Sequence, residues 1–168
     1  MPGQPSEYRS AFEKAILRTV NRLIVTGRKR ATQKVREVYN VKAGDLKQST
    51  RIYRARRAKP EALLVISGKK MPVILFGARQ RAKGTSVRIK KTEGRKLIRH
   101  AFIATMKSGK IQVWMRKGTA RLPIKQLFTV SPPKMFEKEG EKAFQDIIEK
   151  EMSPTFKREL EFYLSRIT

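Results

Sequence analysis

The residues of this chain best suited to chemistry are cations, and they are densest between residues 79 and 99. This stretch holds nine Lys and Arg against one acid, Glu93. At such density the charges repel one another unless anionic partners offset them, and the commonest partner of this kind is a phosphate backbone. We therefore predict contacts to a nucleic-acid backbone for these side chains: Arg79, Arg81, Lys83, Arg88, Lys90, Lys91, Arg95 and Lys96.

A second basic cluster lies in RIYRARRAK, residues 51–59, and contributes Arg51, Arg54, Arg56 and Arg57. The whole chain carries 40 Lys and Arg against 14 Asp and Glu, a net charge of +26. Residues 1–133 hold 33 basic and 6 acidic residues, whereas residues 134–168 hold 7 and 8. Two further roles for the charge stay open at this point: a solvated basic face that aids solubility, and a surface that docks on an acidic protein.

Residues suited to catalysis or metal binding are scarce. The single histidine, His100, adjoins Arg99, and the chain has no cysteine for a thiol nucleophile, a zinc site or a disulfide. The acids of residues 137–151 lie among lysines at helical spacing, which is typical of a solvated helix face. The segments SGKK and KSGK lack the glycine spacing of a phosphate-binding loop. We expect no catalytic residue, no metal site and no cofactor, and we rank an enzyme last among the functions considered.

The basic stretches are preceded by a predicted amphipathic helix over about residues 6–40, with Ser6 as its N-cap. Gly27 could split this helix, but the apolar stripe keeps its phase across that residue, so we favour one helix in which Gly27 lets a neighbouring backbone approach. The stripe is longer than one small sheet can cover, and we expect it to contribute to contacts between subunits. The stripe consists of Phe12, Ile16, Val20, Leu23, Gly27, Ala31, Val35 and Val38, and the predicted subunit contacts are Ile16, Val20, Leu23 and Ala31.

From about residue 51 to residue 130 the pattern changes to short extended runs separated by turn signals. In SVRIKK, Arg88 and Lys90 alternate with apolar residues and are predicted to share one strand face. A hairpin is predicted from residues 101–106 and 111–115, joined by KSGK, with Phe102 and Trp114 dominating its core. The remaining predicted strands are 52–58, 62–67, 72–76 and an edge or irregular strand around Pro123.

Two helices are predicted after Ser131-Pro132-Pro133, one over about residues 136–152 and one after Ser153, which would cap it with Pro154 in the first turn. The sequence thus predicts an α+β fold: a long N-terminal helix, an antiparallel β meander and two C-terminal helices. We expect a single domain of residues 1–168, divided into 1–44, 45–131 and 132–168. No apolar run approaches membrane-spanning length and the N-terminus lacks a signal-peptide pattern, so we expect a soluble, unprocessed chain.

The order of these segments resembles the minor tail protein Z family of lambda-like bacteriophages, the tail completion proteins. The resemblance covers roughly residues 20–136, and it rests on order and spacing because none of the matching residues forms a chemical motif. This chain has His100 where a Gly often precedes Ala-Phe in the family, and a shorter basic insert before Val87. The most specific matches are Ala101-Phe102-Ile103, Lys107 with Gly109, Val113 with Arg116, and Leu122-Pro123-Ile124.

The resemblance implies a structural virion protein that finishes the head-proximal end of a siphophage tail and helps to join tail to head. It further implies a ring, commonly six-fold, whose partners are the tail terminator, the head–tail connector and the double-stranded DNA of the channel. Positive side chains on the wall of such a channel would contact phosphates without reading sequence. The expected location is the virion neck, and the host cytoplasm during assembly. The alternative is a stand-alone basic nucleic-acid-binding protein of ribosomal or nucleoid type, which the charge alone would favour.

Overall fold

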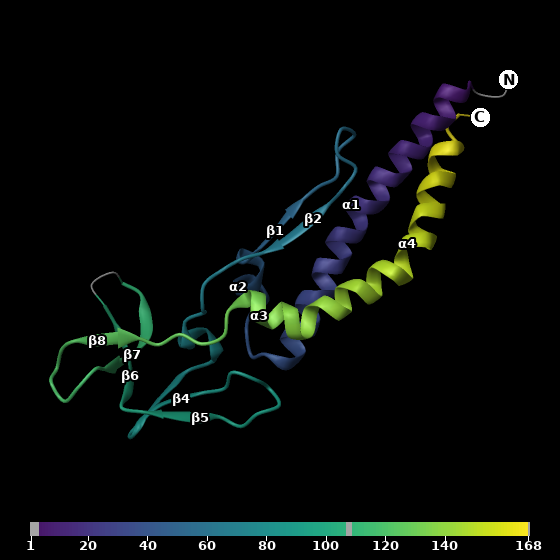
Figure 1. The fold of residues 1–168 in the computed structure, drawn as a ribbon. Coiled ribbons are helices and arrows are strands. Elements are labelled where there is room, and N and C mark those ends of the chain that lie inside the picture. The colour runs from purple at the N-terminus through teal and green to yellow at the C-terminus, as the bar shows by residue number, and fades with distance from the viewer. Residues whose placement is uncertain (1–3, 107–108, 168) are drawn as a thin grey trace.

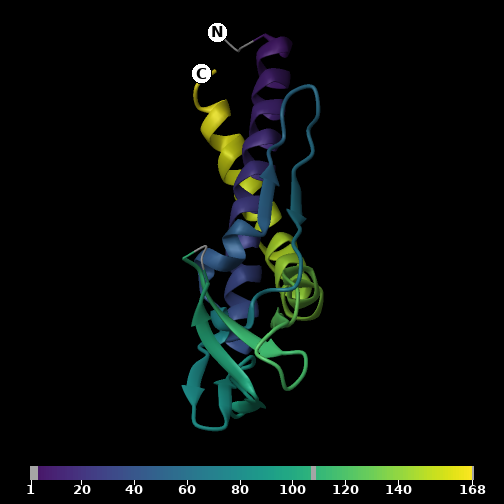
Figure 2. The same cartoon turned by 90° about the vertical axis from the view of Figure 1, so that its left-hand side faces the viewer.

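The computed structural model describes residues 4–106 and 109–167. The molecule is elongated, with a pair of long helices at one end and small antiparallel sheets at the other (Figures 1 and 2). This is the α+β class that the sequence predicts, with a long N-terminal helix followed by strands and then by a C-terminal helix. Among the described residues, no helix is both long and apolar enough to cross a membrane.

The N-terminal helix α1 runs unbroken from Pro5 to Val38, which confirms a single helix through Gly27. It begins one residue before the predicted cap. Gln4 is the N-cap, and the Gln4 backbone N–H donates to the Glu7 carboxylate at 2.8 Å in a capping box, with Pro5 in the first turn. The predicted Ser6 cap is therefore wrong.

The buried face of α1 differs from the predicted stripe in its N-terminal half. Small residues, not the large apolar ones beside them, face the partner helix, because they let the two helices approach closely. Phe12 is 48% exposed and meets Phe156 edge-on, with ring centroids 5.4 Å apart. Apart from Ile24, which is also buried, the buried positions recur every four residues: Ala11, Ala15, Thr19, Leu23, Gly27, Ala31 and Val35.

The partner of α1 is a single long helix, α4, which spans Glu141–Leu164 and runs antiparallel to it (Figure 1). The prediction of two C-terminal helices separated at Ser153 and Pro154 is wrong, because Pro154 lies inside α4. Proline removes one backbone donor, and the helix bends part-way along while its packing on α1 continues. A short helix α3, Pro132–Met135, and a π-helical segment, Phe136–Gly140, lead into it.

The strands form three small antiparallel sheets in place of one continuous meander. The first is a hairpin of β1, Thr50–Tyr53, and β2, Leu63–Ile66, which follows the short helix α2, Ala43–Gln48. The second contains β3, Arg79–Arg81, β4, Gly84–Val87, and β5, Lys96–Arg99. The third contains β6, Ala101–Thr105, β7, Ile111–Arg116, and β8, Ile124–Gln126.

The predicted hairpin of residues 101–115 is confirmed, with Ile103 paired to Val113, although residues 107 and 108 of its turn lie outside the described residues. Its core differs from the prediction. Phe102 and Trp114 pair on the half-buried face, and the buried side is occupied by Ala101 and Val113. The large aromatic residues therefore do not dominate this core.

Three further strand predictions need correction. The strand predicted over 52–58 is the shorter β1, which begins at Thr50 and ends at Tyr53. The segment predicted as a strand over 72–76 is one turn of 3-10 helix, Val73–Phe76, which buries Phe76 completely. The strand around Pro123 is an edge strand as predicted, but β8 begins one residue after the proline. Between β5 and β6, His100 has φ +58°. This left-handed conformation favours glycine over residues that carry a side chain.

Two clusters of buried apolar residues form the core of the molecule. One joins the C-terminal part of α1 to α2, the 3-10 turn and α3 through residues that include Val35, Leu46, Phe76 and Met135. The other lies between the second and third sheets and is built on Val73, Val87, Ala101 and Val113. This second cluster fixes which face of the second sheet points to solvent.

Candidate nucleic-acid interface

The sheet β3-β4-β5 carries arginines on one of its faces. Directly paired residues of antiparallel strands point to the same side of a sheet. Arg79 is paired with Ser86, and Gly84 lies between Arg81 on one side and Arg99 on the other. The three arginines therefore share one face, with only small residues on the central strand between them.

The opposite face of this sheet packs on the protein. Val87 is buried in the cluster between the sheets, and Ile98 packs against it. The hydroxyl of Thr85 donates to the carbonyl of Ala101 at 3.0 Å, and the Ile103 N–H donates to the Gln80 side chain at 2.9 Å. Since these contacts cover that side of the sheet, the arginines lie on the solvent side.

Two more arginines extend this surface. Arg88 follows the end of β4, and Arg95 donates from Nη2 to the Ser86 carbonyl at 2.9 Å and from Nε to the Ser86 hydroxyl at 3.4 Å. Burial, and then the positive charges of Arg79, Arg81 and Arg88, lower the pKa of Arg95, so the guanidinium groups lie close enough to repel one another. We call this surface the arginine face: Arg79, Arg81, Arg88, Arg95 and Arg99.

Gly84 is required at the centre of the arginine face. Its φ is +146°, and a Cβ at this position would overlap the Ile98 carbonyl oxygen. A side chain there would force β4 and β5 apart. The glycine therefore lets β4 and β5 pair in the register that places Arg99 beside it.

Part of the predicted phosphate-contacting set is engaged within the chain. Glu93 accepts Lys96 at 2.7 Å and Lys90 at 3.3 Å, and these partners, Lys96 first, lower the pKa of Glu93. Arg88 donates from Nε to the Glu93 carbonyl at 3.2 Å and from Nη2 to the carbonyl of Lys91. The loop between β4 and β5 is thus organised around one acid.

The prediction that Arg88 and Lys90 project from one strand face is wrong, because β4 ends at Val87 and the backbone of Lys90 instead bridges Tyr39. Four other residues of the predicted phosphate-contacting set have side chains that form no hydrogen bond or ion pair with residues 4–106 or 109–167. These are Arg79, Arg81, Lys83 and Lys91.

Sequence reasoning counted Arg99 in the basic stretch but left it out of the contact set, and it missed Arg116 altogether. Arg99 belongs to the arginine face, and Arg116 lies across an open depression that Lys83, His100 and Phe102 also line. The guanidinium of Arg116 lies 5.8 Å from the centroid of the Phe102 ring. Alternation along β5 could have identified Arg99, whereas Arg116 comes from a different sheet and required the tertiary structure.

The second basic cluster lies on the β1–β2 hairpin, which runs beside α1 and away from the second sheet (Figure 1). Asn21 fastens this hairpin to α1, since its side chain accepts the Ala55 N–H at 2.8 Å and donates to the Ala55 carbonyl at 3.0 Å. Arg57 approaches Glu13 at 3.6 Å. Arg51, Arg54 and Arg56 are exposed, so this cluster forms a separate basic surface.

The structure corrects part of the predicted subunit contact on α1. Leu23 and Ala31 are buried within the chain against α4 and its neighbours, so they are not available to another subunit. Ile16 and Val20 are half-buried. Leu23 and Ala31 are buried because the antiparallel helix α4 and the segment before it pack on this side of α1. Sequence analysis had identified no partner for that side within the chain.

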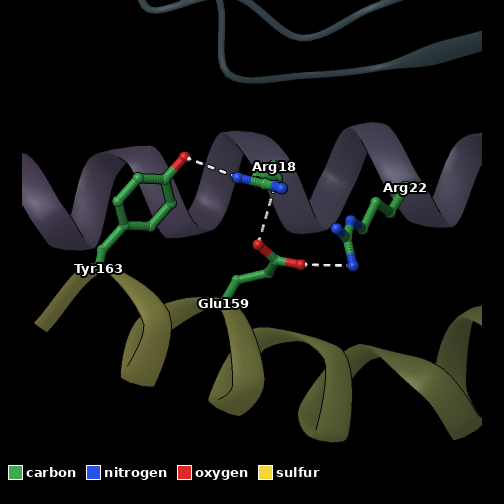
Figure 3. A network of polar contacts seen from close by, with 4 residues as sticks. All are labelled: Arg18, Arg22, Glu159 and Tyr163. Atoms are coloured by element: carbon green, nitrogen blue, oxygen red, sulfur yellow. Dashed lines mark hydrogen bonds and ion pairs between the residues drawn. The ribbon is translucent and has the colours of Figure 1, made fainter. Parts of the chain in front are cut away.

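A polar network crosses the interface between α1 and α4 (Figure 3). The Glu159 side chain is 4% exposed and accepts Arg22 Nη1 at 2.7 Å and Arg18 Nε at 3.0 Å. Arg18 Nη1 also donates to the Tyr163 hydroxyl at 3.5 Å, and this bond together with Glu159 raises the pKa of Arg18. Both arginines of α1 pair with a buried carboxylate of α4, so this network stabilises the contact between the two helices.

The described residues bring no three His, Cys, Asp or Glu side chains together where a metal ion could be held. A comparison with protein families matches residues 7–168 to the model described as prophage minor tail protein Z (GPZ). No curated protein and no solved structure matches the chain.

Proposed function

We propose that this chain, which belongs to the prophage minor tail protein Z family, completes the head-proximal end of a phage tail with its arginine face toward the DNA channel. The family assigns it a structural role in a bacteriophage tail, and hence a place in the virion. The finer assignment rests on one observation, the solvent-facing arginines Arg79, Arg81 and Arg99 that share one face of the second sheet.

The arginine face has the chemistry of a phosphate contact. Guanidinium groups hold phosphate oxygens by charge-assisted, often bidentate hydrogen bonds. Two interstrand spacings separate Arg81 on β3 from Arg99 on β5, so the arginine face is about 10 Å wide across the strands. An anion over Gly84 would relieve the repulsion among the arginines. Contacts of this kind carry no sequence information, as a channel for any genome requires.

We further propose that the protein acts as a ring, six-fold in related tail-completion assemblies, around the DNA. Its neighbours would be the tail terminator and the head–tail connector. The near-neutral C-terminal segment, with 7 basic and 8 acidic residues in 134–168, supports protein contacts there because it lacks the charge excess of the rest of the chain.

Salt-dependent DNA binding tests the arginine face. In the test variant, Arg79, Arg81 and Arg99 are each replaced by Gln. In the control variant, three exposed cations of α1 and α2 are replaced by Gln: Lys29, Arg36 and Lys47. Each phosphate that the protein neutralises adds about 0.9 to the slope of log Kobs against log salt, so the slope should fall by about 2.7 in the test variant and by much less in the control.

Two results would contradict this assignment. One is an equal fall of the slope in the two variants, which would mean that binding follows net charge and not the arginine face. The second is an unchanged slope in a test variant that no longer joins tails. In that case the arginine face docks on an acidic protein of the neck.

A further inference from the structure

The outer face of the β1–β2 hairpin exposes large apolar side chains. Tyr53 is paired with Leu63 and Arg51 with Val65, so these four share one face. Tyr53 is 54% exposed and Leu63 is 48% exposed, and Val65 is exposed as well. The opposite face, with Thr50 and Ile66, turns toward the body of the molecule.

An open groove lies between the hairpin and α1, next to this face. Its apolar lining comes from Val25 of α1 and from Ile52, Tyr53 and Leu63 of the hairpin. Its polar lining is mostly cationic, with Arg28, Arg54, Arg56 and Lys59 against Glu61, which is paired with Lys59 at 2.5 Å. A complementary surface would be apolar with acidic flanks.

The chain carries such a surface on α4. Glu141, Gln145, Glu149 and Met152 lie at helical spacings of four and three, so they line one side of the helix. All four are exposed, and Met152 is 50% exposed. This stripe, which we call the acidic stripe, places two carboxylates and an apolar side chain toward solvent in a chain whose net charge is +26.

The groove and the acidic stripe do not meet within the molecule as described, since Leu63 and Met152 are both exposed. In Figure 1 the hairpin and the C-terminal half of α4 lie on either side of α1. Two different, complementary surfaces on one chain generate a head-to-tail contact when copies associate, and such contacts close into a ring if the rotation permits.

We infer that the groove of one copy receives the acidic stripe of the next copy. Met152 of one copy packs on the apolar lining around Tyr53 and Leu63, while Glu141 and Glu149 face the arginines of the groove. This contact buries apolar side chains that the chain leaves exposed and pairs carboxylates with cations. The inference rests on the proposed ring, for which it names the subunit interface.

Cysteine cross-linking tests this contact against a silent background, because the chain has no cysteine. A double variant, Leu63→Cys with Met152→Cys, is treated with a short bis-maleimide. Head-to-tail contact predicts a ladder of cross-linked species that ends at the ring size and weakens at high salt. The control pair, Lys47→Cys with Met152→Cys, keeps one exposed site and moves the second to α2, and it should give no ladder. Sedimentation of the unmodified protein is measured in parallel.

Three results would overturn the inference. Cross-linked dimers from Leu63→Cys alone, without a ladder, would indicate a two-fold contact between hairpins. Oligomers in sedimentation without a ladder from the double variant would leave the ring standing and place its interface elsewhere. A chain that stays monomeric in sedimentation and forms no ladder would contradict both the ring and this interface.

Discussion

The network around Glu159 should make two half-exposed arginines indispensable to the helix pair. The perturbations are Arg18→Met and Arg22→Met, each made singly and then combined in a double variant. Methionine keeps much of the aliphatic length of each side chain and removes its charge. The arginine side chains are 42% and 46% exposed, whereas the Glu159 side chain is 4% exposed. Removing the arginines therefore leaves a carboxylate that water reaches poorly.

The expected loss of stability follows from this asymmetry. Hydrogen bonds to charged groups contribute about 1.5–3 kcal/mol, so Arg22→Met should lower the free energy of unfolding by about 2 kcal/mol while Arg18 still holds the carboxylate. The double variant should lose about 3–5 kcal/mol, the cost of leaving the buried Glu159 charge without partners. Glu159→Gln should cost only about 1 kcal/mol, because the amide still accepts a hydrogen bond and the arginines can turn to water.

Urea unfolding at neutral pH, followed by circular dichroism, measures these differences. Arg9→Met is the matched control, because Arg9 pairs with Glu13 at 3.7 Å on the surface of the same helix. A surface pair of this kind contributes about 0–1 kcal/mol. A double variant no less stable than Arg9→Met, or no less stable than Glu159→Gln, would refute the claim that the carboxylate is desolvated.

The remaining predictions concern two glycines and one acid. Gly27→Ala should destabilise the protein by about 1–2 kcal/mol despite better helix propensity, because the new Cβ would lie 2.5 Å from a ring carbon of Phe144. Gly44→Ala, with nothing within 4 Å of the new Cβ in α2, should instead stabilise it by about 0.5–1 kcal/mol in the same unfolding assay. The lowered pKa of Glu93 means that its ion pairs contribute above its ordinary value of 4.5 and are lost as the pH falls through the lowered value. An NMR titration midpoint for Glu93 at or above 4.5 would contradict this.

The local sequence pattern predicted whether a segment is a helix or a strand better than it predicted how that segment packs. The period of the apolar residues in 5–38 identifies one long helix. A break at Gly27 would shift the phase of the apolar stripe, and the phase is unchanged across that residue. Alternation and turn residues likewise identify the hairpin of β6 and β7. Both signals depend only on residues close in sequence, so they are legible without the fold.

Which residues of α1 are buried could not be predicted from the stripe. Phe12 is more hydrophobic than Ala11, yet Ala11 is buried and Phe12 is exposed. The choice depends on how closely α4 approaches, and a row of small residues permits the nearer packing. The same dependence on tertiary contacts explains the wrong helix boundary at Pro154. Proline favours the first turn of a helix, but α4 continues through Pro154 because it packs on α1.

The sequence by itself determined the α+β class, the long N-terminal helix and the concentration of charge before residue 134, because composition and period are local properties of the chain. Only the tertiary structure decided which cations act together. Arg79, Arg81 and Arg99 share a face because register pairs β3, β4 and β5, while Lys90 and Lys96, from the same basic stretch, turn to Glu93. The physical reason is that cross-strand register and ion pairing depend on distances in space, which spacing along the chain does not set.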